Sequence, residues 1–274
     1  MPHQHSRGRA WGAGVGAVAL ALVSATAIGS NPAAAANDSV TPALSTGVAP
    51  GGNFDLSRWE LQLPTGSAGS PTTISPTKLE GANGFQDSYF HTDSDDGSMT
   101  FWDPENGVTT PNSKYSRSEL REMNADGSAA SWSIPGTHTL SATLKSTEIP
   151  DHVCVGQIHL AENSGSTKPL LELFYYSNGD IKMGIEQTPA GGNEVLHDVG
   201  TVAPGAQWSY VIQLSGGNTI SLTLNGAKHT WALPSAFNGY PMYFKAGDYD
   251  QSTGGSSSVG AEVQFYALSI KHSS

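Results

Sequence analysis

The sequence predicts an all-β protein, a jelly-roll β-sandwich of two antiparallel sheets with a concave polar cleft. Short stretches in which apolar and polar residues alternate follow one another closely between residues 54 and 270. Asn-Gly pairs at 178–179 and 225–226 follow two of these stretches and are typical of hairpin turns. The sequence has no heptad pattern, no solenoid-length repeat and no long amphipathic helix, which excludes the helical fold classes.

The predicted elements follow one another along the chain. Trp59, Leu61 and Leu63 alternate with polar residues in the first strand. We expect strands over residues 54–63, 99–102, 117–123, 138–145, 152–160, 170–176, 181–186, 194–199, 208–214, 219–224, 243–251 and 261–270. Between them we expect a loop with at most one helical turn at 64–84, a turn at 92–97, a loop at 103–114 and a brief helical turn at 235–237.

The first 36 residues have the features of a secretion signal peptide. Arg7 and Arg9 supply positive charge, residues 11–28 are apolar, and Ala34 to Ala36 fit the small-residue pattern of a cleavage site. No second apolar span follows. We therefore expect a secreted, extracellular protein that has no membrane attachment once residues 1–36 are removed.

The remaining chain divides into a flexible polar tail at residues 37–52 and a single domain at residues 53–274. Loss of residues 1–36 removes two of the 13 basic residues and none of the 24 acidic ones, which changes the formal net charge from −11 to −13. Nucleic-acid binding requires a basic surface. We therefore expect no binding of nucleic acid. We also expect the protein to be a monomer.

Cys154 is the only cysteine, so the chain forms no internal disulfide bond despite its predicted export. It is separated by odd intervals from Gln157 and His159 within one predicted strand. Strict alternation places its side chain on the opposite face, inside the sandwich. We expect a buried small hydrophobic side chain rather than a nucleophile.

The first motif with chemical content is the segment from Arg117 to Met123. In a strand, Arg117, Glu119 and Arg121 share one face, with two guanidinium groups on either side of a carboxylate. The planar fork of a guanidinium matches a carboxylate in two hydrogen bonds, so this face suits a carboxylated ligand. The alternative is an exposed strand whose charges form a cross-strand ion network.

The other two motifs are Gln157-Ile158-His159 and the segment from Tyr243 to Gln251. Alternation places Gln157 and His159 on one face, with Ile158 in the core between them. In the second segment, Tyr243, Lys245, Gly247 and Tyr249 share one side. Aromatic, cationic and amide groups along one wet face are typical of a sugar-binding cleft.

The three motifs together supply the groups that a β-elimination requires. Arginine and an amide neutralise a carboxylate, histidine is a base near neutral pH, and tyrosine is a weak acid. In a 4-linked polyuronate, such groups remove the C5 proton and expel the glycosidic oxygen at C4. Stabilisation of the enolate-like intermediate contributes most of the rate, and a positioned base and acid add about 10²- to 10⁴-fold each.

The three motifs, in this order, resemble the signature strands of the alginate lyases of polysaccharide lyase family 7. The similarity runs from residue 53 to residue 271, so the predicted domain at 53–274 is identified as a catalytic alginate lyase domain with a jelly-roll fold. The resemblance implies alginate as the partner and 4,5-unsaturated uronate ends as the product. We expect cleavage within the polymer, and whether the enzyme acts there or at chain ends depends on whether the loops at 162–168 and 189–193 close the cleft. It implies no cofactor, and no metal ion for the chemistry.

The resemblance also assigns catalytic roles. Arg117 and Gln157 neutralise the uronate carboxylate at the cleaved linkage, with help from Asn112. His159 takes the C5 proton of guluronate. Tyr249 donates a proton to the leaving oxygen, and on mannuronate it serves as both base and acid, which requires nearby cations to lower its pKa from about 10.

Five further residues are implied in substrate binding. Arg121 and Lys245 bind neighbouring sugars, Glu119 holds the arginines in place, and Tyr243 and Gln251 line the cleft. An isoleucine between the glutamine and the histidine, here Ile158, accompanies activity on guluronate-containing blocks in this family.

Two other functions fit a sandwich of this kind. A retaining glucanase requires two carboxylates about 5–5.5 Å apart, but the E-x-D-x-x-E signature is absent. Glu119 between two arginines would have a lowered pKa and would be a poor general acid. The second alternative is a non-catalytic module that binds an acidic polysaccharide, which would not need His159 or Tyr249.

Overall fold

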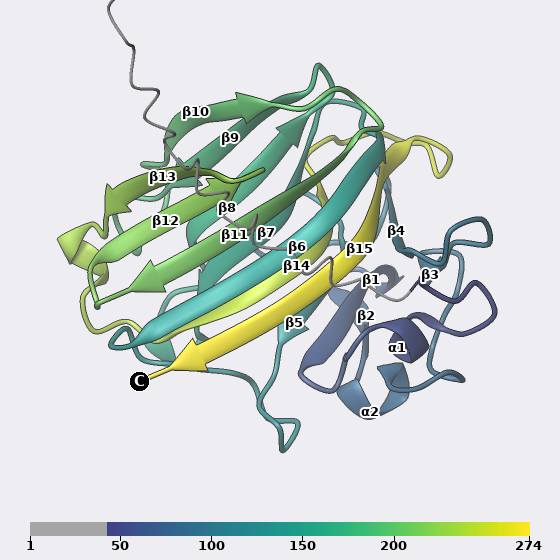
Figure 1. Cartoon of the computed structure of the whole chain (residues 1–274), viewed down its shortest axis with the longest axis horizontal. Helices are drawn as coiled ribbons and strands as arrows, with labels where there is room; N and C mark the ends of the chain where they lie inside the picture. The colour runs from purple at the N-terminus through teal and green to yellow at the C-terminus, as the bar shows by residue number, and fades with distance from the viewer. Residues whose placement is uncertain (1–42) are drawn as a thin grey trace, which may run out of the picture. The chain divides into compact units, whose positions relative to one another are not determined.

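The computed structural model describes residues 43–274, which form two antiparallel β-sheets packed face to face (Figure 1). One sheet has eight strands, in the order β10 (Val195–Thr201), β9 (Asp180–Ile185), β8 (Pro169–Tyr176), β7 (His152–Leu160), β14 (Met242–Asp250), β5 (Ser118–Glu122), β1 (Trp59–Ser67) and β2 (Ser70–Ile74). The other has seven, in the order β13 (Ala227–Ala232), β12 (Thr219–Leu224), β11 (Gln207–Ser215), β6 (Thr137–Glu148), β15 (Gly260–Ser273), β4 (Met99–Pro104) and β3 (Phe90–Thr92). The predicted two-sheet sandwich is confirmed.

Helical structure in the described chain is limited to single turns, namely α1 (Pro50–Asn53), α2 (Pro76–Leu79), η1 (Glu162–Ser164) and η2 (Ser235–Phe237). Two of these, α2 and η2, lie where the sequence predicts brief helical turns. Among residues 43–274, no helix is long and apolar enough to cross a membrane.

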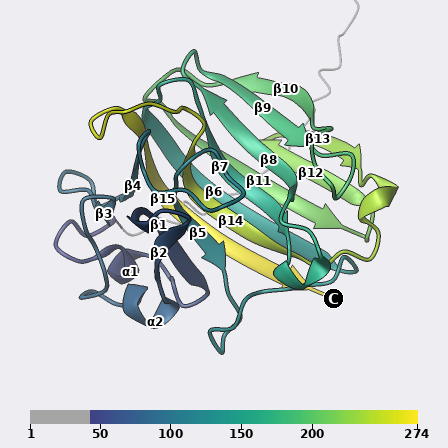
Figure 2. The same ribbon diagram turned by 180° about the vertical axis from the view of Figure 1, so that it is seen from behind.

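The core fills the space between the two sheets. On β6 the buried residues Leu140 and Leu144 alternate with half-exposed ones, and Ile212 of β11 packs in the same layer. Each such side chain contributes about 1.5–3 kcal/mol when it is removed from water. The residues of the cleft described below lie on the face of the eight-stranded sheet that points away from this core. Figure 2 shows the molecule from the side of this sheet.

The structure has three strands that the sequence prediction lacks, β2, β3 and β13, and the first predicted strand has other bounds. The first strand covers Trp59–Ser67 instead of 54–63, and it forms a hairpin with β2 inside the region predicted as a loop. Glycines with positive φ, Gly66 at 119° and Gly69 at 75°, shape the turn. The missed strand β13 is an edge strand whose side chains are all at least partly exposed, so it lacks the apolar alternation of a buried strand.

The structure describes only part of the N-terminal region. The predicted signal peptide at 1–36 and residues 37–42 of the predicted tail lie outside the described residues. Residues 43–52 pack on the domain: Ala49 is buried and donates its backbone N–H to the carbonyl of Ala82 at 2.9 Å. The Asn53 side chain also donates to the Ser45 carbonyl at 2.8 Å. Residues 43–52, which belong to the predicted tail, therefore contact the domain in the structure.

Cys154 is buried, as predicted, but it faces the cleft side of the sheet. Its cross-strand partners are Tyr249 and Phe174, and opposite residues share a face. A β-bulge in β7 places both Val155 and Gly156 on the core side of the sheet. Val155 belongs to the core, and a Cβ on Gly156 would lie 2.7 Å from the Tyr210 hydroxyl inside it. The extra residue reverses the alternation between Cys154 and the residues that follow the bulge. Burial holds the pKa of the Cys154 thiol well above its usual value.

Candidate active site

Four neighbouring strands place one polar side chain each in a single row across the sheet. Register pairs Glu172 of β8 with Gln157 of β7, Gln157 with Lys245 of β14, and Lys245 with Arg121 of β5. Directly opposite residues have Cβ atoms about 4.5–5.5 Å apart, so the row is continuous. A second row pairs His159 with Tyr243, whose rings are 5.2 Å apart.

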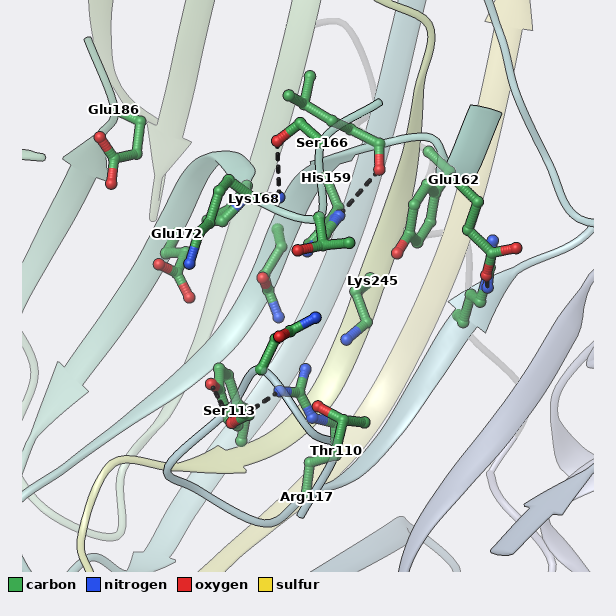
Figure 3. Close-up of a pocket in the computed structure, with 18 of the residues that line it drawn as sticks. Thr110, Ser113, Arg117, His159, Glu162, Ser166, Lys168, Glu172, Glu186 and Lys245 are labelled. Atoms are coloured by element: carbon green, nitrogen blue, oxygen red, sulfur yellow. Dashed lines mark hydrogen bonds and ion pairs between the residues drawn. The ribbon is translucent and has the colours of Figure 1, made fainter. Parts of the chain in front are cut away.

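These rows form the floor of a cleft of about 410 Å³ (Figure 3). Eight of the ten site residues predicted from the sequence line it, namely Asn112, Arg117, Arg121, Gln157, His159, Tyr243, Lys245 and Tyr249. The two exceptions are Glu119, which is fully buried and accepts a hydrogen bond from Gln157, and Gln251, which lies outside the lining. The side chain of Gln251 donates to the backbone carbonyl of Tyr249 at 3.0 Å.

Glu119 organises the centre of the site. Its carboxylate accepts hydrogen bonds from Arg117 at 3.1 Å and from Gln157 at 2.5 Å, and it forms an ion pair with Lys245. Burial alone raises the pKa of Glu119, but Lys245 and Arg117 outweigh burial and hold it below its usual value. Gly247 lets β14 approach this point, since a Cβ there would lie 2.8 Å from the Cα of Glu119. These contacts favour the charged form of Glu119, which makes it an anchor for its partners and unsuited to act as a general acid.

Arg121 has a different partner from the one predicted. Its guanidinium pairs with Glu162, from the loop after β7, and lies 4.5 Å from the centre of the Tyr243 ring. Glu119 thus holds Arg117 and Lys245, and it does not hold both arginines. The reason is that the second cation beside Glu119 comes from β14, which lies next to β5 in the sheet.

Arg117 and Tyr249 form one unit. The guanidinium carbon lies 3.7 Å from the centre of the Tyr249 ring, and Ser113 is within 3.0 Å of the phenol oxygen. Burial raises the pKa of Tyr249, and the opposing effects of Arg117 and the Ser113 hydrogen bond do not offset it. A role of Tyr249 as a base requires a lowered pKa, and the surroundings raise it instead. The phenol of Tyr249 is therefore suited to donate a proton at neutral pH.

His159 is held as a neutral base. Its Nδ1 lies 3.0 Å from the Leu160 carbonyl, an acceptor only, so Nδ1 carries the proton and Nε2 keeps a lone pair. Burial, together with Lys245 and Arg117, lowers the pKa of His159 to about 3. An anionic ligand that neutralises those two cations would raise this pKa and strengthen the base.

The charge on Lys245 is also modified by its surroundings. Burial and the neighbouring Arg117 lower the pKa of Lys245 to about 8, against the opposing effect of Glu119. Burial raises the pKa of the Tyr243 phenol to about 12. Tyr243 therefore offers a ring face and a hydroxyl to a ligand, and no charge.

Several lining residues carry no signal in the sequence. They are Gln62, Thr110, Ser113, Glu162, Ser166, Thr167, Lys168, Glu172, Glu186 and Gly192. Most are in loops, whose positions over the sheet no periodic pattern encodes. Gln62 and Glu172 lie on strands, in register with Glu119 and Gln157, and could have been found by alternation. Among residues 43–274, no cluster of three or more His, Cys, Asp or Glu side chains is arranged to hold a metal ion.

The buried charge cluster makes Glu119→Gln strongly destabilising. Arg117 and Lys245 would face each other without a carboxylate, and breaking a buried ion pair costs about 3–5 kcal/mol. We expect the free energy of unfolding to fall by this amount near pH 6. Above pH 8 the decrease should be smaller, because Lys245 can release its proton there. Urea unfolding at both pH values measures it, with the exposed Glu148→Gln as a control that changes stability by less than about 0.5 kcal/mol. A loss below about 1 kcal/mol at both pH values would contradict this role.

The buried neutral state of His159 makes stability depend on pH. An unfolded histidine titrates near pH 6.5, whereas His159 in the folded protein titrates near 3. Between these values only the unfolded chain binds the proton, so the contribution of His159 to stability is present above pH 6.5 and decreases as the pH falls. As the pH falls from about 6 to about 4, the free energy of unfolding of His159→Gln should rise relative to that of wild type by up to about 1.4 kcal/mol per pH unit. Urea unfolding measures this difference. Parallel curves for the two proteins would show that His159 does not resist protonation.

Comparison with known proteins identifies the family. Residues 54–272 match the family model described as alginate lyase. A curated alginate lyase of Klebsiella pneumoniae is 28% identical over 280 residues, which cover 82% of this chain and 91% of that protein.

Solved structures agree with this match. The family 7 alginate lyase A1-II′, as a variant in complex with the substrate GGMG, is 34% identical with a TM-score of 0.74, over 82% of this chain and 97% of that one. An alginate lyase from Pseudomonas aeruginosa is 31% identical with a TM-score of 0.72, over 80% of this chain and 100% of that one. This chain belongs to the alginate lyases of polysaccharide lyase family 7.

Proposed function

We propose that this alginate lyase is secreted and cleaves guluronate-containing stretches of alginate within the polymer, by β-elimination. The observation that carries the mechanism is that Arg117, Gln157, His159 and Tyr249 line one cleft together with Lys245. A cation pair, an amide, a neutral base and a phenolic acid can then reach a single uronate ring.

Arg117, Gln157 and Asn112 are proposed to bind the C6 carboxylate of the sugar that loses its proton. Removal of the C5 proton moves negative charge onto that carboxylate, so donors that are already in place stabilise the intermediate most strongly. The ion pair and hydrogen bonds to Glu119 hold Arg117 and Gln157 in position before substrate arrives. Lys245, which is buried in the cleft floor, adds a further positive charge.

His159 and Tyr249 are proposed to divide the proton transfers. The free Nε2 of His159 takes the C5 proton of guluronate, and Tyr249 donates its phenolic proton to the glycosidic oxygen as the C4–O bond breaks. Guluronate and mannuronate differ in configuration at C5, so their C5 protons point to opposite faces of the ring. Tyr249 would therefore take the proton of mannuronate after its own proton is lost, a step that its raised pKa makes difficult. This difference supports the preference for guluronate.

Cleavage inside the polymer is supported by the extent of the polar row. It continues on both sides of Gln157, to Glu172 on β8 and to Arg121 on β5, so sugars can be bound on either side of the cleaved linkage. The loops at 162–168 and 189–193 border the cleft, where Ser166 donates to the Pro189 carbonyl at 2.6 Å. Secretion is supported by the signal-peptide features of residues 1–36.

Tyr249→Phe should lower kcat by about 10²- to 10⁴-fold on guluronate blocks, because the leaving oxygen loses its proton donor. KM should change little, since the ring that packs on Arg117 is retained. Steady-state kinetics on purified blocks measure both constants. An unchanged kcat would assign the proton transfer to another group.

Incubation of the protein with alginate tests the proposed reaction. Elimination produces unsaturated ends that absorb in the ultraviolet, and size analysis of early products shows whether internal linkages break first. Saturated reducing ends would instead indicate a hydrolase. Binding without any product would indicate a non-catalytic polysaccharide-binding module.

A further inference from the structure

The cleft floor is positively charged at one end and acidic at the other. Lys245 and Arg121 occupy the row over β14 and β5, whereas Glu172 occupies it over β8. Figure 3 shows Glu172 and Glu186 together on one side of the cleft, away from Glu162 on the other side. A polyuronate that follows the row therefore passes from cations to carboxyl groups, which would repel it if they were charged.

A second carboxyl group lies next to Glu172 in the same row. Glu172 is in register with Gly184 of β9, and a Cβ on Gly184 would lie 2.0 Å from Oε1 of Glu194. The Glu194 carboxyl thus fills the space over Gly184, beside Glu172. Its Oε1 is buried and has no hydrogen-bond partner in the structure. Two carboxyl groups this close are stabilised when at least one of them is protonated.

The surroundings of Glu172 do not compensate its charge. The polar groups that face it come from every neighbouring element. They are Gln157 and Cys154 from β7, Lys245 and Tyr249 from β14, Glu119 from β5 and Arg117 just before it, Glu194 and Glu186 from the β9 side, and Lys168 from the loop before β8. Within residues 43–274, none of them forms an ion pair or a hydrogen bond with the Glu172 carboxyl. Burial and Glu194 raise the pKa of Glu172 to about 8, and burial and Glu186 raise the pKa of Glu194 to about 7.

We propose that Glu172 is a substrate-binding residue that acts as an uncharged carboxylic acid, donating a hydrogen bond to the sugar next to the one held by Gln157. One strand spacing, about 4.8 Å, separates the two positions in the row. In its ionised form Glu172 repels the anionic chain and weakens binding at this position. This inference rests on the proposed function, because it takes polyuronate as the ligand.

The direction of the pH effect follows from the proton. Below about pH 8 Glu172 keeps its proton and donates a hydrogen bond to the substrate. Each pH unit above that value lowers the protonated fraction by about tenfold, and KM can rise by as much. Lys245 also loses its proton in this range, so the effect of Glu172 must be read as a ratio between two proteins that share Lys245.

The test compares wild type with Glu172→Gln on guluronate oligosaccharides between about pH 6 and pH 9. Glutamine keeps a donor and cannot ionise. We expect the KM ratio of wild type to variant to be near one at low pH and about tenfold at the upper limit, with equal kcat. In Glu194→Gln, KM should begin to rise at a lower pH than in wild type, because Glu194 helps Glu172 to retain its proton. Glu148→Gln, an exposed carboxyl on the other sheet, should leave the profile unchanged.

Binding measured without turnover separates this inference from the proposed reaction. Calorimetry with a guluronate oligosaccharide, in a His159→Asn background with and without Glu172→Gln, should give the same pH-dependent ratio in Kd. Equal pH profiles for the two proteins, with unchanged unfolding midpoints, would overturn the role of Glu172 even if unsaturated products form. A wild-type protein that forms no unsaturated ends would overturn the proposed reaction, while calorimetry would still decide the role of Glu172.

Discussion

Arg117→Ala is expected to abolish cleavage of guluronate, mannuronate and mixed blocks alike. Both uronates carry the same C6 carboxylate, and the charge that develops there must be stabilised whichever base removes the C5 proton. Loss of a single positioned donor to a developing oxyanion costs about 10²- to 10³-fold in kcat. The loss should be larger for Arg117, because its guanidinium also holds the ring of Tyr249 at 3.7 Å. The rate of ultraviolet absorbance increase on each purified block measures the effect.

The fold should tolerate Arg117→Ala, since Glu119 keeps Lys245 and Gln157 as partners. Arg117→Lys retains the charge but not the two-pronged geometry, and should recover only part of the activity. Lys228→Ala, which removes an exposed charge on the edge strand β13, is the matched control and should be fully active. Near-wild-type turnover of Arg117→Ala on any one block would remove this residue from the mechanism.

His159→Ala is expected to eliminate guluronate cleavage while leaving a measurable rate on mannuronate. Only the guluronate reaction uses the free Nε2 as its base, and a positioned base contributes about 10²- to 10⁴-fold. The mannuronate reaction depends on Tyr249, which lies elsewhere in the cleft and keeps its contacts with Arg117 and Ser113. Initial rates on the two purified blocks give the ratio directly.

A second histidine of the same strand provides the control for His159→Ala. His152 begins β7, packs on Tyr176 with ring centres 4.7 Å apart, and is not part of the cleft lining. His152→Ala should therefore leave the preference between the two blocks unchanged. If His159→Ala lowered both rates equally, the histidine would act by positioning the substrate and not as the base for one epimer.

Strand alternation correctly placed the arginines of the first motif and the polar pair of the second on the cleft face. Arg117 and Arg121 lie on one face of the chain, as do Gln157 and His159, because the members of each pair are an even number of residues apart and the extra residue in β7 comes before Gln157. The same rule was wrong for Cys154, since an extra residue in β7 reverses the alternation. A bulge depends on pairing with neighbouring strands, which the local sequence pattern does not report.

Charge partners were harder to predict than positions. Glu119 is next to two arginines in sequence, yet its second cation is Lys245, more than a hundred residues away along the chain. Arg121 instead pairs with Glu162 from a loop. The pKa of Tyr249 depends on how deeply the phenol is buried, which no motif states. Sheet order and burial, not spacing, determine these properties.

The most direct test of the mechanism is a crystal structure of His159→Asn with a guluronate tetrasaccharide. We predict one sugar whose carboxylate lies within hydrogen-bond distance of Arg117 and Gln157, whose C5 faces residue 159, and whose glycosidic oxygen at C4 faces the Tyr249 hydroxyl. An oligosaccharide bound elsewhere, or one whose carboxylate turns away from Arg117, would contradict the elimination mechanism.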